Sequence, residues 1–301
     1  MTDATVVIPC RNGARTLAET LGSIVRQEWS RPWEVLFIDN GSTDGSAEIF
    51  DSAAMAYRHL PMRRVDASER PGKARALNFA IPQARGRAIL LVDSDDVVAP
   101  GWLAAMANAL DENDLVAAAT DYRPLNEPWV LEARIRDPEA RERLQRAYRF
   151  HYQILPYVSG HCMGFTRRLF DALDGFDEAY AVGDDVDFSL RAQLEGFPIR
   201  AVPEAVVYYR LRDALPQIRR QAHLYAVDQV LLSKRLPEVA RPMRVRWHSF
   251  GRETRRLARQ GGRFLLDRAW RDRVRTARLL WSLGWYSGLL RGMVAFRAPP
   301  P

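Results

Sequence analysis

The chain has 301 residues, of which 47% are hydrophobic and 27% charged, and apolar runs recur as far as Phe296. This excludes disorder over most of the length and allows one large domain or two small ones. The two cysteines, Cys10 and Cys162, lie far apart, which excludes a disulfide framework and a zinc site built on cysteine pairs; reduced thiols are expected. The net charge of +7 hides a basic C-terminal arm, residues 241–301, which carries +12 while the rest carries −5.

Taken in chain order, the first 120 residues alternate apolar β-branched runs with helical spacing. A strand pattern begins at Thr5 without the features of a secretory signal, so we expect a cytoplasmic protein. Strands are expected at 5–9, 33–39, 64–66, 88–93 and 115–120. Helices are expected around 17–25, from 46, over 73–80 and over 102–110. This alternation predicts an α/β fold with a mainly parallel sheet flanked by helices.

The remainder of the chain has a different pattern. Residues 122–157 are more polar and indicate a loop with an amphipathic helix. A second group of strands and helices follows over 158–209, and from 215 onward the pattern is helical and rich in arginine. We therefore expect a basic helical C-terminal extension.

Three of the predicted strands end in polar residues, and ligands gather at the carboxyl ends of parallel strands. The three runs are Pro9-Cys10-Arg11-Asn12, Asp39-Asn40-Gly41-Ser42-Thr43-Asp44 and Asp93-Ser94-Asp95-Asp96. One such run could be a turn or a helix cap. Three of them on neighbouring strands favour a ligand site.

The third run is the most informative. Asp93, Asp95 and Asp96 crowd like charges directly after an apolar strand, and a bound cation would relieve their repulsion. Carboxylate oxygens suit Mg²⁺ or Mn²⁺. Mg²⁺ held by few carboxylates completes its coordination with phosphates, so a diphosphate is the expected ligand.

Neither a G-x-G-x-x-G fingerprint nor a G-x-x-x-x-G-K-[ST] loop is present, so basic side chains must contact the phosphates. The run Arg70-Pro71-Gly72-Lys73-Ala74-Arg75 supplies them. The alternative reading of this run is a solvated helix start with a capping glycine.

Six short motifs occur in order between about residues 5 and 212. They are Val7-Ile8-Pro9-x-Arg11-Asn12, Ile38-Asp39-Asn40-Gly41-Ser42-Thr43-Asp44-Gly45, Gly72-Lys73-Ala74-x-Ala76-Leu77-Asn78, Leu91-Val92-Asp93-Ser94-Asp95-Asp96, Gly175-Phe176-Asp177-Glu178 and Gly183-Asp184-Asp185-Val186-Asp187-Phe188. Together they resemble glycosyltransferase family 2, the inverting enzymes of GT-A fold that use nucleotide-diphosphate sugars. The resemblance implies a metal-dependent inverting glycosyltransferase, with UDP as the usual nucleotide, whose acceptor could be a glycan or lipid-linked.

The resemblance also implies roles for individual residues. Those assigned to the donor and its metal are Pro9, Arg11 and Asn12 around the base, Asp39 bonding the base, Arg70 and Lys73 near the diphosphate, Asp93 and Ser94 by the nucleotide sugar, and Asp95 with Asp93 on Mg²⁺ or Mn²⁺. On the acceptor side, Asp185 matches the catalytic base, because inversion needs one group to take the acceptor proton. The family usually has Glu-Asp where this chain has Asp184-Asp185, so Asp184 stays open as the base. The segment 207–210 lacks a histidine that some members use as a metal ligand, so a third protein ligand also stays open.

The resemblance suggests a GT-A catalytic domain over 1–213, with a nucleotide-sugar half (1–121) and an acceptor half (122–213), followed by the Arg-rich region 214–301. Two other functions stay open. One is an inactive nucleotide-sugar or membrane-binding module, which acids at both Asp95 and Asp185 disfavour. The other is a sugar-1-phosphate nucleotidyltransferase, for which Arg11-Asn12-Gly13-Ala14 is a poor Gly-rich loop.

Two further pairs have simple explanations. His161 and Cys162 are too few for a zinc site, and a packed strand is expected there. Asp187 and Arg191 are four apart on a predicted helix, which predicts a surface ion pair.

The C-terminal arm indicates an anionic partner of its own. Its longest uncharged run, 279–290, is too short to span a bilayer. The arm is basic and rich in leucine and contains Trp281 and Trp285, which is typical of a segment that lies on the inner membrane face. A charged helix packed on the catalytic domain fits the same residues equally well. Nucleic acid is not expected, because no recognition motif accompanies the charge.

Overall fold

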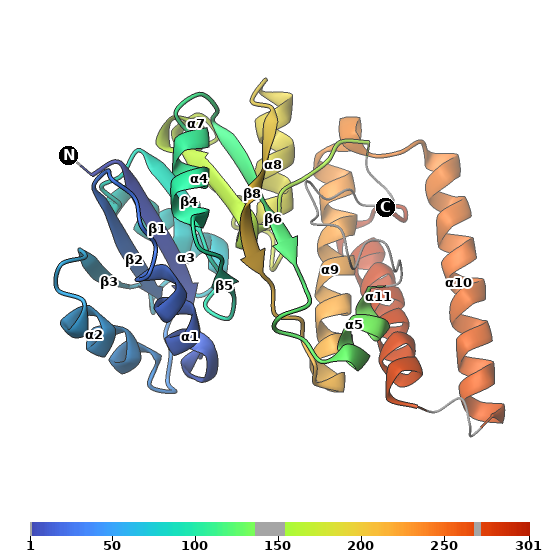
Figure 1. The fold of residues 1–301 in the computed structure, drawn as a ribbon. Helices are drawn as coiled ribbons and strands as arrows, with labels where there is room; N and C mark the ends of the chain where they lie inside the picture. Colours follow the sequence, from blue (N-terminus) through green and yellow to red (C-terminus); the bar gives the residue numbers. More distant parts are fainter. Residues whose placement is uncertain (1, 136–153, 268–271) are drawn as a thin grey trace.

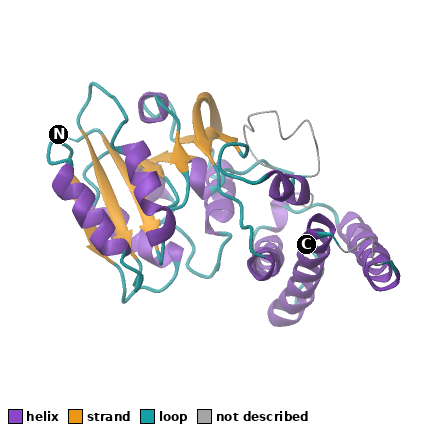
Figure 2. Cartoon of the chain, turned by 60° about the horizontal axis from the view of Figure 1, so that its bottom comes forward, coloured by secondary structure: helices purple, strands orange, loops and turns teal. Residues whose placement is uncertain are grey.

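A computed structural model describes residues 2–135, 154–267 and 272–301 (Figure 1). Its strands form one sheet in the order β3-β2-β1-β4-β7-β6-β8-β5. Figure 2 shows the strands gathered in the N-terminal part of the molecule and long helices in the C-terminal part. The α/β fold with a helical extension, predicted from the sequence, is confirmed.

The first part of the sheet is parallel, as predicted. Its strands are β1 (Ala4–Cys10), β2 (Trp33–Asp39), β3 (Met62–Asp66) and β4 (Ala88–Leu91). The helices between them are α1 (Ala14–Ile24), α2 (Ser46–Ala56) and α3 (Lys73–Ala80). Cys10 is in register with Asp39, and Asp39 with Asp66, so these strands end level with one another. The polar residues that follow β1 and β2 are therefore brought to one edge of the sheet.

The second part of the sheet is mixed. Its strands are β5 (Val97–Val98), β6 (Leu115–Asp121), β7 (Met163–Thr166) and β8 (Ile199–Tyr208). Its helices are α4 (Trp102–Ala109), α5 (Pro128–Arg134), α7 (Arg167–Ala172) and α8 (Asp184–Leu194). β7 is antiparallel to both β4 and β6, whereas β6 and β8 are parallel. The amphipathic helix expected within 122–157 is represented by α5, and residues 136–153 lie outside the described part of the chain.

Two expectations about the second part were wrong in detail. His161 and Cys162 belong to a 3₁₀ turn, η2 (Gly160–Cys162), and not to a strand, because the Cys162 amide donates to the Ser159 carbonyl at 3.0 Å and closes the turn. The Asp187–Arg191 ion pair forms at 2.7 Å, but it is not on the surface, since only 2% of the Asp187 side chain is exposed.

The core follows from the apolar strands. Side chains such as Ile8, Phe37 and Phe165 are completely buried between the sheet and its helices. A strand covered on both faces is mostly apolar, which is the pattern of β1 and β4, whereas β2 contains the buried Glu34, which pairs with Arg63. Burial of each large side chain contributes about 1.5–3 kcal/mol to stability, so this core holds the strand ends in place.

Three long helices complete the chain: α9 (Leu215–Arg235), α10 (Met243–Leu266) and α11 (Arg273–Phe296). α11 runs along α9 with unusually close backbones: a Cβ at Gly284 would lie 2.2 Å from the Arg219 carbonyl oxygen, and one at Gly288 2.2 Å from that of His223. α11 also contacts α5, whereas α10 lies along the outer side of α11 (Figure 1). Within the described residues, no helix has both the length and the apolar content needed to cross a membrane.

Candidate functional site

A cavity of about 880 Å³ opens at the carboxyl ends of β1, β2 and β4. All but two of the residues to which the family resemblance gave a role line it: Pro9, Arg11, Asn12, Lys73, Asp93, Ser94, Asp95, Asp184 and Asp185. The two exceptions are Asp39 and Arg70. The structure thus brings the ends of separate strands and the start of α8 around one space.

The two exceptions have structural reasons. Asp39 is 8% exposed, and its carboxylate accepts a hydrogen bond from the Ser42 amide at 2.8 Å, which closes the turn after β2. Arg70 is exposed and its guanidinium lies over the Phe79 ring, 5.7 Å from the centroid. Asn40 lines the cavity in their place; its side-chain amide donates to the Arg70 carbonyl at 2.7 Å.

Side-chain bonds tie the strand-end loops together. Asn12, in the left-handed region with φ 57°, accepts from the Thr43 amide at 2.8 Å. The hydroxyls of Thr16 and Thr20 both donate to the Ser94 carbonyl. The loop after β4 is therefore anchored to α1, which fixes the acids that flank Ser94.

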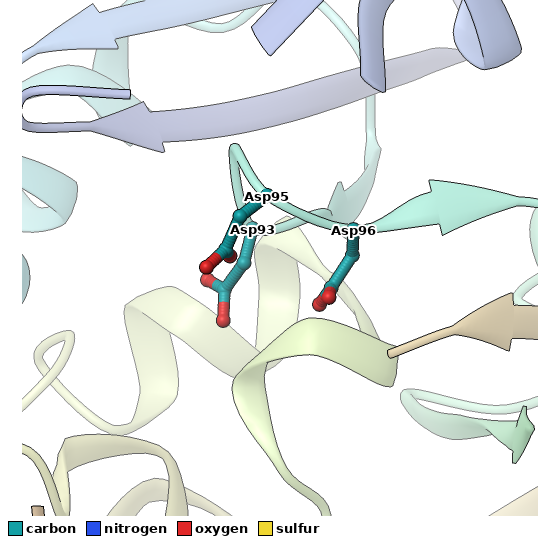
Figure 3. A group of neighbouring side chains, drawn as sticks. All are labelled: Asp93, Asp95 and Asp96. Carbon is teal, nitrogen blue, oxygen red and sulfur yellow. The ribbon is translucent and has the colours of Figure 1, made fainter. Parts of the chain in front are cut away.

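Asp93, Asp95 and Asp96 form the acid cluster (Figure 3), in which one oxygen from each carboxylate lies within 4.8 Å of the others. Asp93 pairs with the Lys73 ammonium at 2.5 Å, and Asp95 with the Arg212 guanidinium at 2.5 Å. Burial acts to raise the pKa of Asp93, but the charge of Lys73 outweighs it and holds that pKa below its usual value.

Asp96 is the buried member of the cluster. One of its oxygens accepts from the Arg210 amide at 2.8 Å, and the other has no partner among the described residues. Burial, followed by the charges of Asp95 and Asp93, raises the pKa of Asp96. An orphaned buried oxygen beside two further carboxylates is a set of hard donors that fits Mg²⁺ or Mn²⁺.

Asp184 and Asp185 begin α8 and form the acid pair on the other side of the cavity. Asp185 accepts from the Gly160 amide at 2.6 Å and from the Val186 amide at 2.8 Å. Asp184 is 3% exposed and one of its oxygens has no partner among the described residues. Burial, with the charge of Asp185, raises the pKa of Asp184 to about 7.

Lys73 lies between the acid cluster and the acid pair. A Cβ at Gly160 would lie 3.1 Å from the Lys73 ammonium and 3.3 Å from an Asp185 oxygen, so the absence of a side chain there leaves room for both. Burial alone would lower the pKa of Lys73, but the charges of Asp93, Asp184 and Asp185 raise it. Lys73 therefore remains a cation shared by both groups of acids.

Sequence reasoning missed one wall of the cavity. It consists of Tyr209 and Arg212 after β8 and of Gln217, Arg220, Gln221, Leu224 and Tyr225 on α9. No motif marks the α9 residues, because only packing of the C-terminal helices brings them to the sheet. For Arg212 a signal existed: a basic residue shortly after a strand whose end faces an acidic run.

His161 contributes no charge to the site at neutral pH. Its ring is hydrogen-bonded to the Thr120 hydroxyl at 2.9 Å and to the Ser159 hydroxyl at 3.0 Å, and it is 4% exposed. Burial lowers the pKa of His161 to about 4. The ring is thus a neutral support for the loop that contains Gly160.

Solved structures share this fold. A mannosyltransferase from Pyrobaculum calidifontis, in complex with GDP-Man and Mn²⁺, aligns with a TM-score of 0.61 at 20% identity, covering 97% of this chain and 75% of that one. Staphylococcus aureus TarS 1–349 with UDP-GlcNAc aligns with a TM-score of 0.53 at 20% identity, covering 76% of this chain and 67% of that one. The sheet and its acidic edge define a protein of GT-A fold.

The family follows from the sequence. The model of glycosyl transferase family 2 matches residues 5–174, more than half of the chain. The chain belongs to this family, and the resemblance seen in its motifs is confirmed.

Individual relatives match parts of this chain. Glycosyltransferase GlyG of Streptococcus pneumoniae is 32% identical over 117 residues, which are 39% of this chain and 38% of GlyG. The uncharacterized glycosyltransferase EpsJ of Bacillus subtilis is 27% identical over 216 residues, 68% of this chain and 60% of EpsJ. The chain therefore spans less than two thirds of the length of these two relatives.

Proposed function

We propose that this chain is a metal-dependent, inverting glycosyltransferase that moves a sugar from a nucleotide-diphosphate donor to a glycan or lipid-linked acceptor. UDP is the first candidate for the nucleotide. The observation that carries the proposal is that Asp93 and Asp95 of the acid cluster line one cavity of about 880 Å³ together with the acid pair. The complexes of the two GT-A neighbours with GDP-Man and UDP-GlcNAc support this class of donor.

Roles on the donor side follow the cavity wall. Pro9, Arg11 and Asn12 would hold the base, with Asp39 as a hydrogen-bond acceptor beside them. Asp95 and Asp93 would hold Mg²⁺ or Mn²⁺, which when bound stabilises the charge that develops on the departing diphosphate.

The cations near the acids would act on the same diphosphate. Lys73 and Arg212 are 30% and 45% exposed and each already faces a carboxylate. With the donor bound, these two cations would balance its phosphate charge. Arg70, exposed outside the cavity wall, would contribute only at longer range.

On the acceptor side, Asp185 would take the proton of the attacking hydroxyl. The new bond from that oxygen to the sugar C1 forms while the bond from C1 to the diphosphate oxygen breaks, and the proton passes to a carboxylate oxygen of Asp185. Burial raises the pKa of Asp185, which strengthens it as a base, while the charge of Lys73 and the amides of Gly160 and Val186 favour its ionised form. Asp184, which is more buried, would support Asp185.

A thermal-shift screen of nucleotide sugars with and without Mn²⁺ tests this function. Ligand that binds the native state stabilises it by about 2.7 kcal/mol at 100 times Kd. We expect one nucleotide class to raise Tm by several degrees in the presence of Mn²⁺ only. No rise with any nucleotide sugar would contradict the proposal and favour another function for the cavity.

We further propose that residues 1–213 form the catalytic domain, divided at 121 into donor and acceptor halves, and that 214–301 support it. α11 packs on α9, and residues of α9 line the cavity, which is consistent with a C-terminal region that stabilises the catalytic domain. Isolated 1–213 should then lose donor binding together with stability.

We also propose that the protein acts at the inner membrane face through α10. The exposed residues of this helix include Trp247 (49%), Leu265 (73%) and Leu266 (90%). Exposed arginines accompany them: Arg252, Arg255, Arg259 and Arg263. An apolar and basic exposed helix fits an anionic lipid surface.

Removing two arginines of α10 tests the membrane proposal. Each basic residue near an anionic surface is worth about 1 kcal/mol, so Arg255→Gln with Arg259→Gln should weaken binding to phosphatidylserine vesicles roughly 30-fold. Arg26→Gln with Arg58→Gln, exposed residues of the N-terminal part, is the matched control. If both double variants float with vesicles equally, α10 does not bind the membrane.

A further inference from the structure

The loop that leads into the acid pair is held by a residue from another part of the chain. One carboxylate oxygen of Asp228, on α9, accepts from the Val182 amide at 2.7 Å and from the Gly183 amide at 3.0 Å. Gly183 is the N-cap of α8 and has no side chain that could cap the helix itself. Asp228 thus supplies an acceptor at the very start of the helix that carries Asp184 and Asp185.

The fit between this loop and α9 is close. A Cβ at Gly183 would lie 3.2 Å from Asp228 Cβ, so a larger residue would push the loop and the carboxylate apart. Asp228 is 5% exposed, and with Asp185 it lines a small cavity of about 60 Å³. The carboxylate has little freedom to move away from the two amides.

α9 itself is fixed at this level by α11. A Cβ at Gly288 would lie 2.8 Å from Ala226 Cβ, and one at Gly292 would lie 2.9 Å from Val230 Cβ. These contacts flank Asp228 on both sides along α9. The carboxylate is therefore presented from a rigid pair of helices.

We propose that Asp228 is a positioning residue for the acid pair: it fixes the point at which α8 begins and so directs Asp185 toward the acceptor side of the cavity. This inference rests on the proposed role of Asp185 as the base. A small displacement of a catalytic group, on the order of 1 Å, can cost about 10²-fold in rate. The C-terminal helices thereby contribute to catalysis without contacting the reacting atoms.

Three variants separate positioning from other roles. Asp228→Ala removes the acceptor, and sugar transfer should fall by roughly 10²-fold while donor affinity, measured by calorimetry, stays close to wild type. Asp228→Asn keeps a side-chain oxygen and should retain most of the turnover. Ser233→Ala, a buried polar residue of α9 away from the loop, is the matched control and should change stability but not kcat. Should Asp228→Ala fail to fold, Asp228→Ser, too short to reach both amides, replaces it with the same expected loss.

A double variant tests whether Asp228 acts through Asp185. If it does, Asp185→Asn combined with Asp228→Ala should be no slower than Asp185→Asn alone, because groups that act as a unit are not additive. If the rate loss of the double variant equals the product of the two single-variant losses, the proposal is overturned. Wild-type turnover by a folded Asp228→Ala variant would overturn it as well. Asp228→Asn as slow as Asp185→Asn would show that Asp228 itself handles a proton. By contrast, wild-type transfer by Asp185→Asn contradicts the proposed function, whatever the Asp228 variants do.

Discussion

Asp95→Asn is expected to abolish Mn²⁺-dependent donor binding and nearly all sugar transfer. The change removes a charged ligand from the acid cluster and also the partner of Arg212, which lies 2.5 Å from the Asp95 carboxylate. A metal ion contributes several kcal/mol to stabilising the transition state, so turnover should fall on the order of 10³-fold. The measurements are donor affinity by calorimetry with and without Mn²⁺, and release of nucleoside diphosphate.

Two comparisons make this result specific. Asp121→Asn removes an acid that pairs with Arg123 and does not line the cavity, and it should behave as wild type. Arg212→Gln leaves the acid cluster intact. It should lower donor affinity, but Mn²⁺ should still increase that affinity. Full activity of Asp95→Asn in EDTA would show that no metal is used at this position.

Asp185→Asn should reduce transfer by roughly 10²–10⁴-fold, the usual range for loss of a general base. The amide keeps the shape of the carboxylate and its place at the start of α8, but it cannot accept the proton. Donor affinity should stay close to wild type, because the residues proposed to hold the diphosphate and its metal, Asp93, Asp95 and Lys73, line another part of the cavity wall.

Asp184→Asn is the control for the assignment of Asp185 as the base, and it should reduce the rate of sugar transfer less than Asp185→Asn does. Asp184 is buried, and burial with the charge of Asp185 raises the pKa of Asp184, which makes this carboxyl the one that more readily keeps its proton and not the acceptor of a new one. If Asp184→Asn is inactive and Asp185→Asn transfers at the normal rate, the base is the neighbouring residue. If both variants remain active, the proton goes elsewhere.

Much of the fold could be predicted because its signals are local. Alternating apolar strands and helical spacing predicted the strands of the parallel part of the sheet and the helices between them, but not the order of the strands in the sheet. β5 was not predicted, because two residues carry no periodicity and the strand exists only through pairing with β8. The antiparallel direction of β7 was also beyond reach, since it depends on which strands it meets and not on its own residues.

The same distinction applies to the site. Asp93 and Asp95 were found because they stand in a contiguous acidic run directly after an apolar strand, whereas the Asp184-Asp185 pair was found only through its resemblance to a family motif. Arg212, which follows β8, had a weak sequence signal, whereas Asp228 acquires its importance only when α9 is folded against the loop before α8. The surface placement of the Asp187–Arg191 pair was wrong for a related reason: helical spacing predicts that two residues meet, but not which face of the helix is covered.

The glycines of the C-terminal helices respond in opposite ways to one substitution. Replacing glycine by alanine inside a helix normally gains about 1 kcal/mol, since alanine loses less backbone entropy. That gain is available in α10, where a Cβ built at Gly251, Gly261 or Gly262 meets no described atom within 4 Å apart from its chain neighbours and the nearby backbone of α10 itself. In α11 the added methyl at Gly284 or Gly288 would meet a carbonyl oxygen of α9 at 2.2 Å. Replacing every helical glycine by alanine would therefore stabilise α10 but separate α11 from α9.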